Sequence, residues 1–171
     1  MVGANAVRPD YEYSVSLLEQ SKYLYLRQLT EPRENSLRIV VEQAIADRSA
    51  PGPMLDYASP LQEISRDASP IRSTPECKTF ELIWDRYVAY LVTNESVSSG
   101  DPDKEEAYSG NVFREYTKSH FLKHLSRDTD AHFEPVHHYK LICLNHIIDI
   151  ASYRPAKVRL LESTFDNSKP N

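Results

Sequence analysis

The stretch His137-His138-Tyr139-Lys140-Leu141-Ile142-Cys143-Leu144-Asn145-His146-Ile147-Ile148-Asp149-Ile150 is the densest run of apolar and β-branched residues in the chain. Such a run is typical of a central strand in a hydrophobic core. We therefore predict one extended strand over residues 137–150. The same run holds three of the six histidines, one of the two cysteines and a carboxylate, so any site in this protein should involve it.

An extended conformation decides how the metal-binding residue types in this run are arranged. Cys143 and His146 would point to opposite faces, because side chains three apart in a strand alternate, and so could not bind one ion. His138 and His146 would share a face but lie about 26 Å apart at ~3.3 Å per residue. If the segment were instead helical, the thiol and the imidazole of Cys143 and His146 would be neighbours. With an extended strand we expect no metal and no cofactor here.

Asp149 lies between two isoleucines, and a carboxylate in such surroundings must be paired or protonated. Arg38, Arg86 and Arg114 each interrupt an apolar run and are the expected partners. The structural interpretation is a buried ion pair that fixes strand register. The alternative interpretation is a catalytic acid.

The remaining segments predict an antiparallel sheet with a few short helices, which is an α+β fold in a single globular domain over residues 1–171. For Tyr11–Leu29 both helix and strand fit, and we favour a strand followed by a helix that ends before Pro32. Residues 1–9 and 163–171 are expected to be loose, and residues 47–76 to form a long loop rich in proline and serine. The expected strands are Asn35–Glu42, Thr79–Asn94, Val112–Tyr116 and an edge strand at Val158–Leu161.

Ser119 is placed to cap a helix over His120–Arg127, since its hydroxyl oxygen can accept a hydrogen bond from a free backbone N–H of the first turn. His120 and His124 are four apart on that helix and share a face, with Asp128 one turn further on. This pair is better arranged for a metal than Cys143 and His146, but the glutamate of a zinc-protease helix is missing and solvated histidines are the alternative. A metal site here is our third and weaker hypothesis.

Composition narrows the class of protein. The chain has 171 residues with 40% hydrophobic and 26% charged residues, and no run long enough to span a membrane. No secretory signal precedes the first strand, so we expect a cytoplasmic protein. The net charge of −5 argues against a nucleic-acid partner. No glycine-rich phosphate loop and no nucleophile elbow is present, which favours a protein that is not an enzyme.

Five carboxylates surround Lys104 in the segment Glu95–Glu106. Such a segment is usually solvated, but it can also steer a basic partner toward the protein. Tyrosine, at 11 residues, is a type favoured in interfaces. The resulting candidates for a partner-binding surface are Glu95, Asp101, Asp103, Glu105, Glu106 and Tyr108.

A second hypothesis is a small-molecule-binding protein or an enzyme. Its pocket would combine a carboxylate, an amide and a histidine if the strand that ends at Asn94 neighbours residues 137–150. The alternative pocket consists of Asn94, Glu95, Arg114, His146 and Asp149. This hypothesis requires the five side chains to converge.

Several phrases resemble small uncharacterised bacterial proteins of the kind found among polymorphic-toxin immunity proteins. These phrases are residues 35–42, residues 87–96, Phe113-Arg114-Glu115-Tyr116 with Ser119, and residues 138–149. The resemblance carries no catalytic signature. It implies a cytoplasmic antidote that blocks a toxin by surface complementarity, and it agrees with our leading hypothesis of a non-catalytic protein-binding module.

Overall fold

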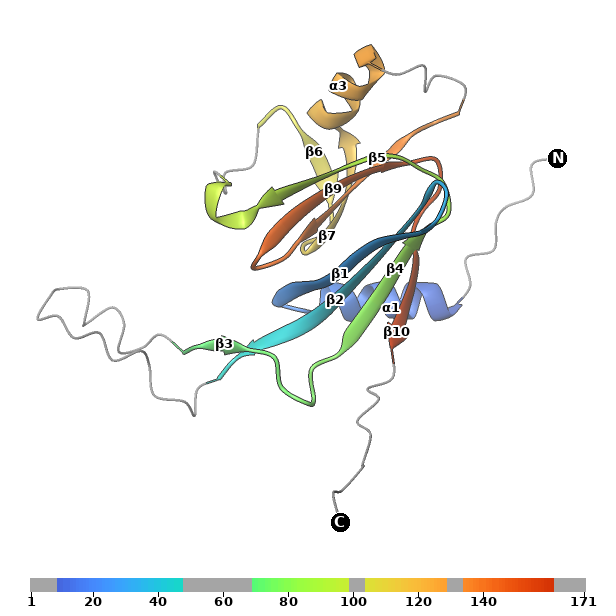
Figure 1. The fold of residues 1–171 in the computed structure, drawn as a ribbon. Coiled ribbons are helices and arrows are strands. Elements are labelled where there is room, and N and C mark those ends of the chain that lie inside the picture. The colour runs from blue at the N-terminus through green and yellow to red at the C-terminus, as the bar shows by residue number, and fades with distance from the viewer. Residues whose placement is uncertain (1–8, 48–68, 99–103, 129–133, 162–171) are drawn as a thin grey trace, which may run out of the picture.

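The computed structural model describes residues 9–47, 69–98, 104–128 and 134–161. In this part of the chain, antiparallel strands form two five-stranded sheets, and two short α-helices accompany them (Figure 1). The prediction of a mainly antiparallel fold with a few short helices is confirmed, although the protein is largely β. None of the described helices is long and apolar enough to cross a membrane.

The first sheet has the order β1-β2-β4-β10, with β3 paired to the far end of β2. The predicted strands at 35–42 and 158–161 are confirmed as β2 and the edge strand β10. The bounds of its strands are β1 Tyr23–Arg33, β2 Ser36–Ala46, β3 Ile71–Arg72, β4 Thr79–Trp84 and β10 Lys157–Leu161.

The second sheet has the order β5-β9-β8-β7-β6, and all its pairings are antiparallel. Helix α3, His120–Asp128, follows β7, and Ser119 caps it as predicted, with the Leu122 N–H 3.0 Å from its hydroxyl oxygen. The predicted strand at 112–116 is β7. The bounds of the strands are β5 Tyr87–Asn94, β6 Ala107–Ser109, β7 Phe113–Lys118, β8 His137–Ile142 and β9 His146–Ser152.

The prediction of one strand over residues 137–150 is wrong, because the chain reverses at Cys143–Asn145 and forms a β-hairpin. The Cys143 N–H donates to the His146 carbonyl at 2.9 Å across this turn. No glycine or proline marks the reversal at Cys143–Asn145. The apolar run is therefore two neighbouring buried strands.

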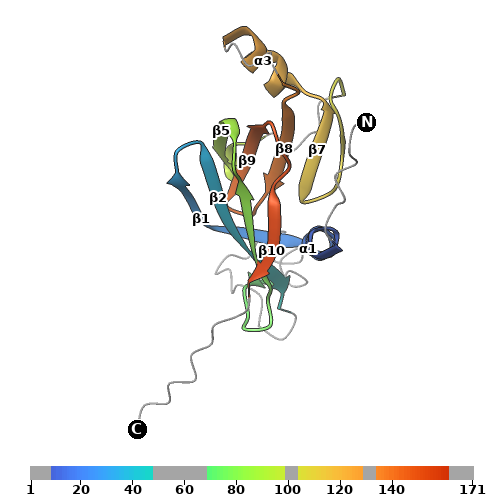
Figure 2. The same cartoon turned by 90° about the vertical axis from the view of Figure 1, so that its right-hand side faces the viewer.

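The segment Thr79–Asn94 is likewise two strands, since the chain bends at Asp85–Arg86 and passes from the first sheet to the second. The inner faces of the two sheets pack on each other (Figures 1 and 2). Trp84, at the end of β4, contacts the rings of Phe113 and Tyr139 in the second sheet, with centroids 6.3 and 6.1 Å away. One core cluster thus draws buried residues from both sheets.

The order of elements at the N-terminus is the reverse of our expectation. Helix α1, Pro9–Glu19, comes first and lies across the first sheet beside β10 (Figure 2), and β1 follows it. Pro9 suits the first turn of a helix, where its missing N–H has no partner in any case. Pro32 lies inside β1, which an edge strand tolerates, and the register shifts between Thr30 and Arg33. Leu18 buries the apolar side of α1 in the core.

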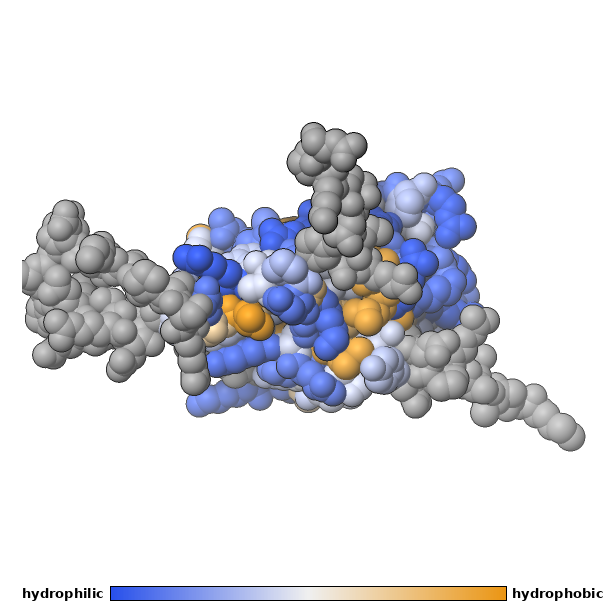
Figure 3. Space-filling view, turned by 90° about the horizontal axis from the view of Figure 1, so that it is seen from below, coloured by the Kyte–Doolittle hydropathy of each residue, from blue (hydrophilic) through white to orange (hydrophobic). Residues whose placement is uncertain are grey.

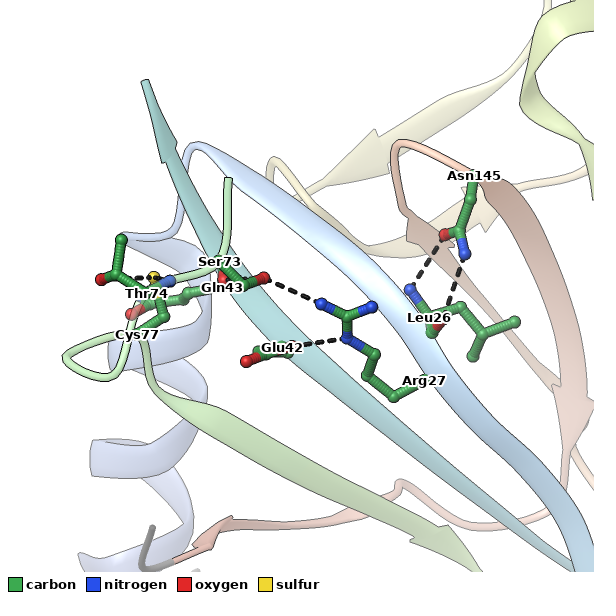
Figure 4. Close-up of polar contacts among 8 residues, drawn as sticks. All are labelled: Leu26, Arg27, Glu42, Gln43, Ser73, Thr74, Cys77 and Asn145. Atoms are coloured by element: carbon green, nitrogen blue, oxygen red, sulfur yellow. Dashed lines mark hydrogen bonds and ion pairs between the residues drawn. The ribbon is translucent and has the colours of Figure 1, made fainter. Parts of the chain in front are cut away.

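Asn145 joins the edge of β1 to the β8–β9 turn. Its side-chain oxygen accepts the Leu26 N–H, and its side-chain N–H donates to the Leu26 carbonyl, each at 3.0 Å (Figure 4). The Leu144 N–H also donates to the Leu24 carbonyl at 2.8 Å. These bonds take the place of a neighbouring strand, so the first half of β1 is not an open edge.

The predicted loop at 47–76 and the predicted loose termini fall mostly outside the described residues. The exceptions are residue 47, residues 69–76, which include the short strand β3, and the start of α1. Figure 3 shows the molecule from below, where the described surface is mostly hydrophilic and its apolar areas are small and separate. No broad apolar face is visible on the described surface in that view.

Candidate functional site

A chain of polar side chains joins α3 to the outer face of the second sheet. Ser119 Oγ lies 2.8 Å from His138 Nδ1, and His138 Nε2 lies 2.8 Å from Asp149 Oδ1. Lys140 Nζ lies 3.1 Å from the same carboxylate oxygen. We call these four residues the polar chain.

Strand periodicity explains the position of the polar chain. On β8, His138 and Lys140 alternate with Tyr139 and Leu141, which face the core, so the polar pair faces outward. Asp149 is the register partner of Lys140 on β9. Although it faces outward, His138 is only 1% exposed, because the rings of Tyr116 and Phe121 cover it.

Both ring nitrogens of His138 have hydrogen-bond partners in the polar chain. When the ring is neutral, its Nε2–H donates to Asp149, and its Nδ1 accepts from the Ser119 hydroxyl, a tautomer assigned from the bonding partners. Burial lowers the pKa of Lys140, but the Asp149 carboxylate and its hydrogen bond raise the pKa by more, so the net shift is upward. Lys140 therefore remains charged and neutralises Asp149.

The connectivity Ser119–His138–Asp149 matches that of a catalytic triad, but the surroundings oppose catalysis. The Ser119 oxygen already accepts the Leu122 N–H as a helix cap. The Glu106 carboxylate accepts the His120 N–H at 2.8 Å, so a negative charge lies where an oxyanion would need N–H donors. The polar chain therefore anchors α3 to the second sheet.

The predicted arginine partners of Asp149 are wrong, since its partners are His138 and Lys140. Arg38 instead binds Glu81, which is 2% exposed and also binds Arg159. The other two predicted arginines lie elsewhere: the Arg86 side chain reaches Glu134, and the Arg114 guanidinium lies over the Tyr108 ring at 4.3 Å. Asp149 thus forms a structural ion pair across neighbouring strands, as the structural interpretation predicted, but its cation is Lys140 rather than an arginine.

The five residues of the alternative pocket do not converge. His146 and Asp149 are three apart on β9, so their side chains project from opposite faces. Asn94 is the register partner of His146 at the end of β5, with Glu95 beyond it, whereas Arg114 lies two strands away on β7. His146 Nδ1 is buried without a hydrogen-bond partner among the described residues.

Cys143 and His146 do come close, because they face each other across the hairpin turn, and the opposite-face argument against zinc therefore fails. Burial raises the pKa of the Cys143 thiol to about 12, which disfavours the thiolate that a metal would need. In the described ranges no three His, Cys, Asp or Glu side chains are grouped so that they could hold a metal ion. His120 and His124 lie on one exposed face of α3, as predicted.

The candidate partner-binding residues are divided between the two edges of the second sheet. Glu95 is exposed directly after β5, whereas Glu105, Glu106 and Tyr108 lie at β6. Three strands separate these edges, which is about 19 Å at ~4.8 Å per strand. Asp101 and Asp103 lie outside the described residues. The acidic residues that are described thus do not form one continuous patch.

The edge strand β5 is a feature that the sequence prediction missed. Leu91 is 51% exposed and Val92 is 40% exposed, although they project from opposite faces. Val92 is the register partner of the fully buried Ile148, so it belongs to the core-facing side. One signal in the sequence could have indicated this exposed strand: no charged residue occurs from Tyr87 to Asn94.

The described residues form a mainly antiparallel structure with two sheets, an anchored surface helix and a strand edge, at β5, that no other described strand covers. In comparisons with known proteins, no family model, no curated protein and no solved structure matches this chain. The functional inference therefore depends on the described surface itself.

Proposed function

We propose that this protein is a non-catalytic protein-binding module that receives an extended segment of its partner along β5. The observation that carries the proposal is the unprotected edge of this strand. Backbone N–H and C=O groups at a sheet edge are a template for another strand, and natural edges normally carry protecting features. Strand addition uses these groups for affinity.

Within the described part of the chain, strand β5 lacks the usual protecting features. Its eight residues include no charged side chain and no proline, and its one register irregularity lies at the start, between Tyr87 and Ala89. The second half exposes Leu91 and Val92 on its two faces. An added strand would cover both side chains and pair the free backbone groups.

The other described edges are protected. Strand β1 holds Arg27, Glu31 and Arg33, and Asn145 covers its first half. Strand β6 has only three residues, and β10 has five residues with two cations on its outer face. The contrast makes β5 the edge best suited to a partner in the described part of the chain.

A toxin-blocking immunity protein is the particular form of this module that we propose, in the cytoplasm. The net charge of −5, the exposed Glu95 beside β5 and the resemblance of several phrases to immunity proteins support it. Inhibition by strand addition would need no catalytic group on this chain.

Photocrosslinking tests the proposed function. A photoreactive amino acid in place of Leu91 should capture a partner in producing cells, whereas the same residue in place of Leu160, an exposed position on β10, should not. The captured partner, once identified and purified, should slow hydrogen exchange of the β5 amides. Leu91→Lys should weaken its binding at least about tenfold, since a charge blocks pairing at an edge, and Leu160→Lys should not. A partner that binds without protecting β5 would refute the proposal.

A further inference from the structure

We infer that the partner segment has an apolar centre of about four residues with a basic residue at each end. This inference rests on the proposed strand addition to β5, and it names the chemistry of the segment that fits there. The apolar centre follows from Leu91 and Val92, because an added strand has neighbours on both faces and both of these neighbours are apolar.

One carboxylate lies at each end of the open half of β5. Glu95 follows the strand directly and is exposed. At the other end, Glu31 of β1 accepts a hydrogen bond from the Tyr90 hydroxyl at 2.8 Å and remains exposed. Hydrogen bonding to Glu31 and burial raise the pKa of Tyr90, so the phenol stays protonated and holds the carboxylate beside β5.

Both carboxylates are available to a partner. Among the described residues neither Glu31 nor Glu95 forms an ion pair, whereas Glu42 and Glu81 are each bound by arginine. From Tyr90 to its last residue, Asn94, strand β5 extends about 13 Å at ~3.3 Å per residue, and Glu95 begins the short 3-10 helix that follows. Two basic residues five positions apart in the partner would reach both carboxylates, whichever way the segment runs.

The same charges argue against a second copy of this chain as the occupant. In a β5–β5 pairing each Glu95 would face a strand with no basic residue between Tyr87 and Val97. The basic residue next to the strand, Arg86, already pairs with Glu134 at 3.4 Å. The occupant that complements the edge is a different protein with a basic-flanked apolar segment.

The experiment compares three capped peptides with the full chain, followed through backbone amide NMR shifts at peptide concentrations up to about 1 mM. The first peptide is Lys-Val-Ile-Thr-Val-Lys, the second has Glu in place of both Lys, and the third is the Lys peptide with alternate backbone nitrogens methylated. We expect the first peptide to shift the β5 amides and to bind roughly tenfold more tightly than the second at low salt. This preference should vanish near 0.5 M salt because exposed charges are screened.

Two variants assign the preference to the named carboxylates. Glu31→Gln combined with Glu95→Gln should abolish it, whereas the matched control Glu76→Gln with Glu115→Gln, two exposed carboxylates elsewhere, should leave it intact. Equal binding of the Lys and Glu peptides at β5 would overturn the charge inference alone. Binding of the methylated peptide as tight as that of its parent, or no binding by any peptide, would overturn strand addition itself.

Discussion

Replacing Asp149 with alanine should lower the free energy of unfolding by about 3 kcal/mol. The change removes the acceptor of the His138 Nε2–H, which is sealed in the sheet, and leaves the Lys140 charge without its partner. A hydrogen bond to a charged group contributes about 1.5–3 kcal/mol. The ion pair adds less than a fully buried one would, since the Lys140 side chain is 22% exposed and is partly screened by water.

Asp149→Asn is the matched variant, because its amide oxygen can still accept from His138 while the negative charge is gone. We expect Asp149→Asn to lower the free energy of unfolding by about 1–1.5 kcal/mol. Asp149→Ala should lower it by about a further 1–1.5 kcal/mol, because it also removes the hydrogen-bond acceptor of His138. The Lys140→Met change alone should be milder than Asp149→Ala, because Asp149 keeps its bond to His138.

Urea unfolding at pH 7, followed by circular dichroism, measures these differences. A shift of the midpoint with an unchanged slope would report a true change in stability. A double-mutant cycle of Asp149→Ala with Lys140→Met isolates the ion pair. Equal losses for the alanine and asparagine variants, or a loss below about 1 kcal/mol for alanine, would refute the role that we assign to the polar chain.

Three further predictions concern stability. Burial raises the pKa of Glu81, but its two arginines lower the pKa by more, so the net shift is downward. The stability that the Glu81 carboxylate contributes is therefore present above pH ~4.5 and is lost as the pH falls through its lower pKa in the folded protein. Glu81→Gln should destabilise the protein at pH 7 but much less near pH 3, as measured by urea unfolding at both pH values. Asn145→Ala should lower the free energy of unfolding by about 1–3 kcal/mol in the same assay. It should also speed hydrogen exchange at the Leu26 amide, because Leu26 loses both of its hydrogen bonds to the Asn145 side chain. Unchanged exchange at Leu26 would contradict the role that we assign to Asn145. Gly110→Ala should lower the melting temperature by several degrees, because Gly110 has φ +90° and an added Cβ would lie 2.1 Å from the Phe113 carbonyl oxygen.

Local sequence patterns determined much of the secondary structure. The β-branched centre of residues 35–42 predicts β2, and the short apolar segments at 112–116 and 158–161 predict β7 and β10, since these signals depend only on nearby residues. Ser119 marks the start of α3 because a serine hydroxyl satisfies a first-turn amide wherever the helix lies. The antiparallel character of the fold also followed from the absence of long helices between the strands.

The tertiary structure alone decided where the long apolar runs turn and which strands are neighbours. Residues 79–94 and 137–150 keep their apolar pattern through the bend and the hairpin turn, because the strands on both sides are buried. Pairing joins β5 to β9 rather than to its sequence neighbour β4, and this choice gave Asp149 its histidine and lysine and left β5 with an open edge. Such long-range packing depends on the whole core, and no local pattern in the sequence encodes it.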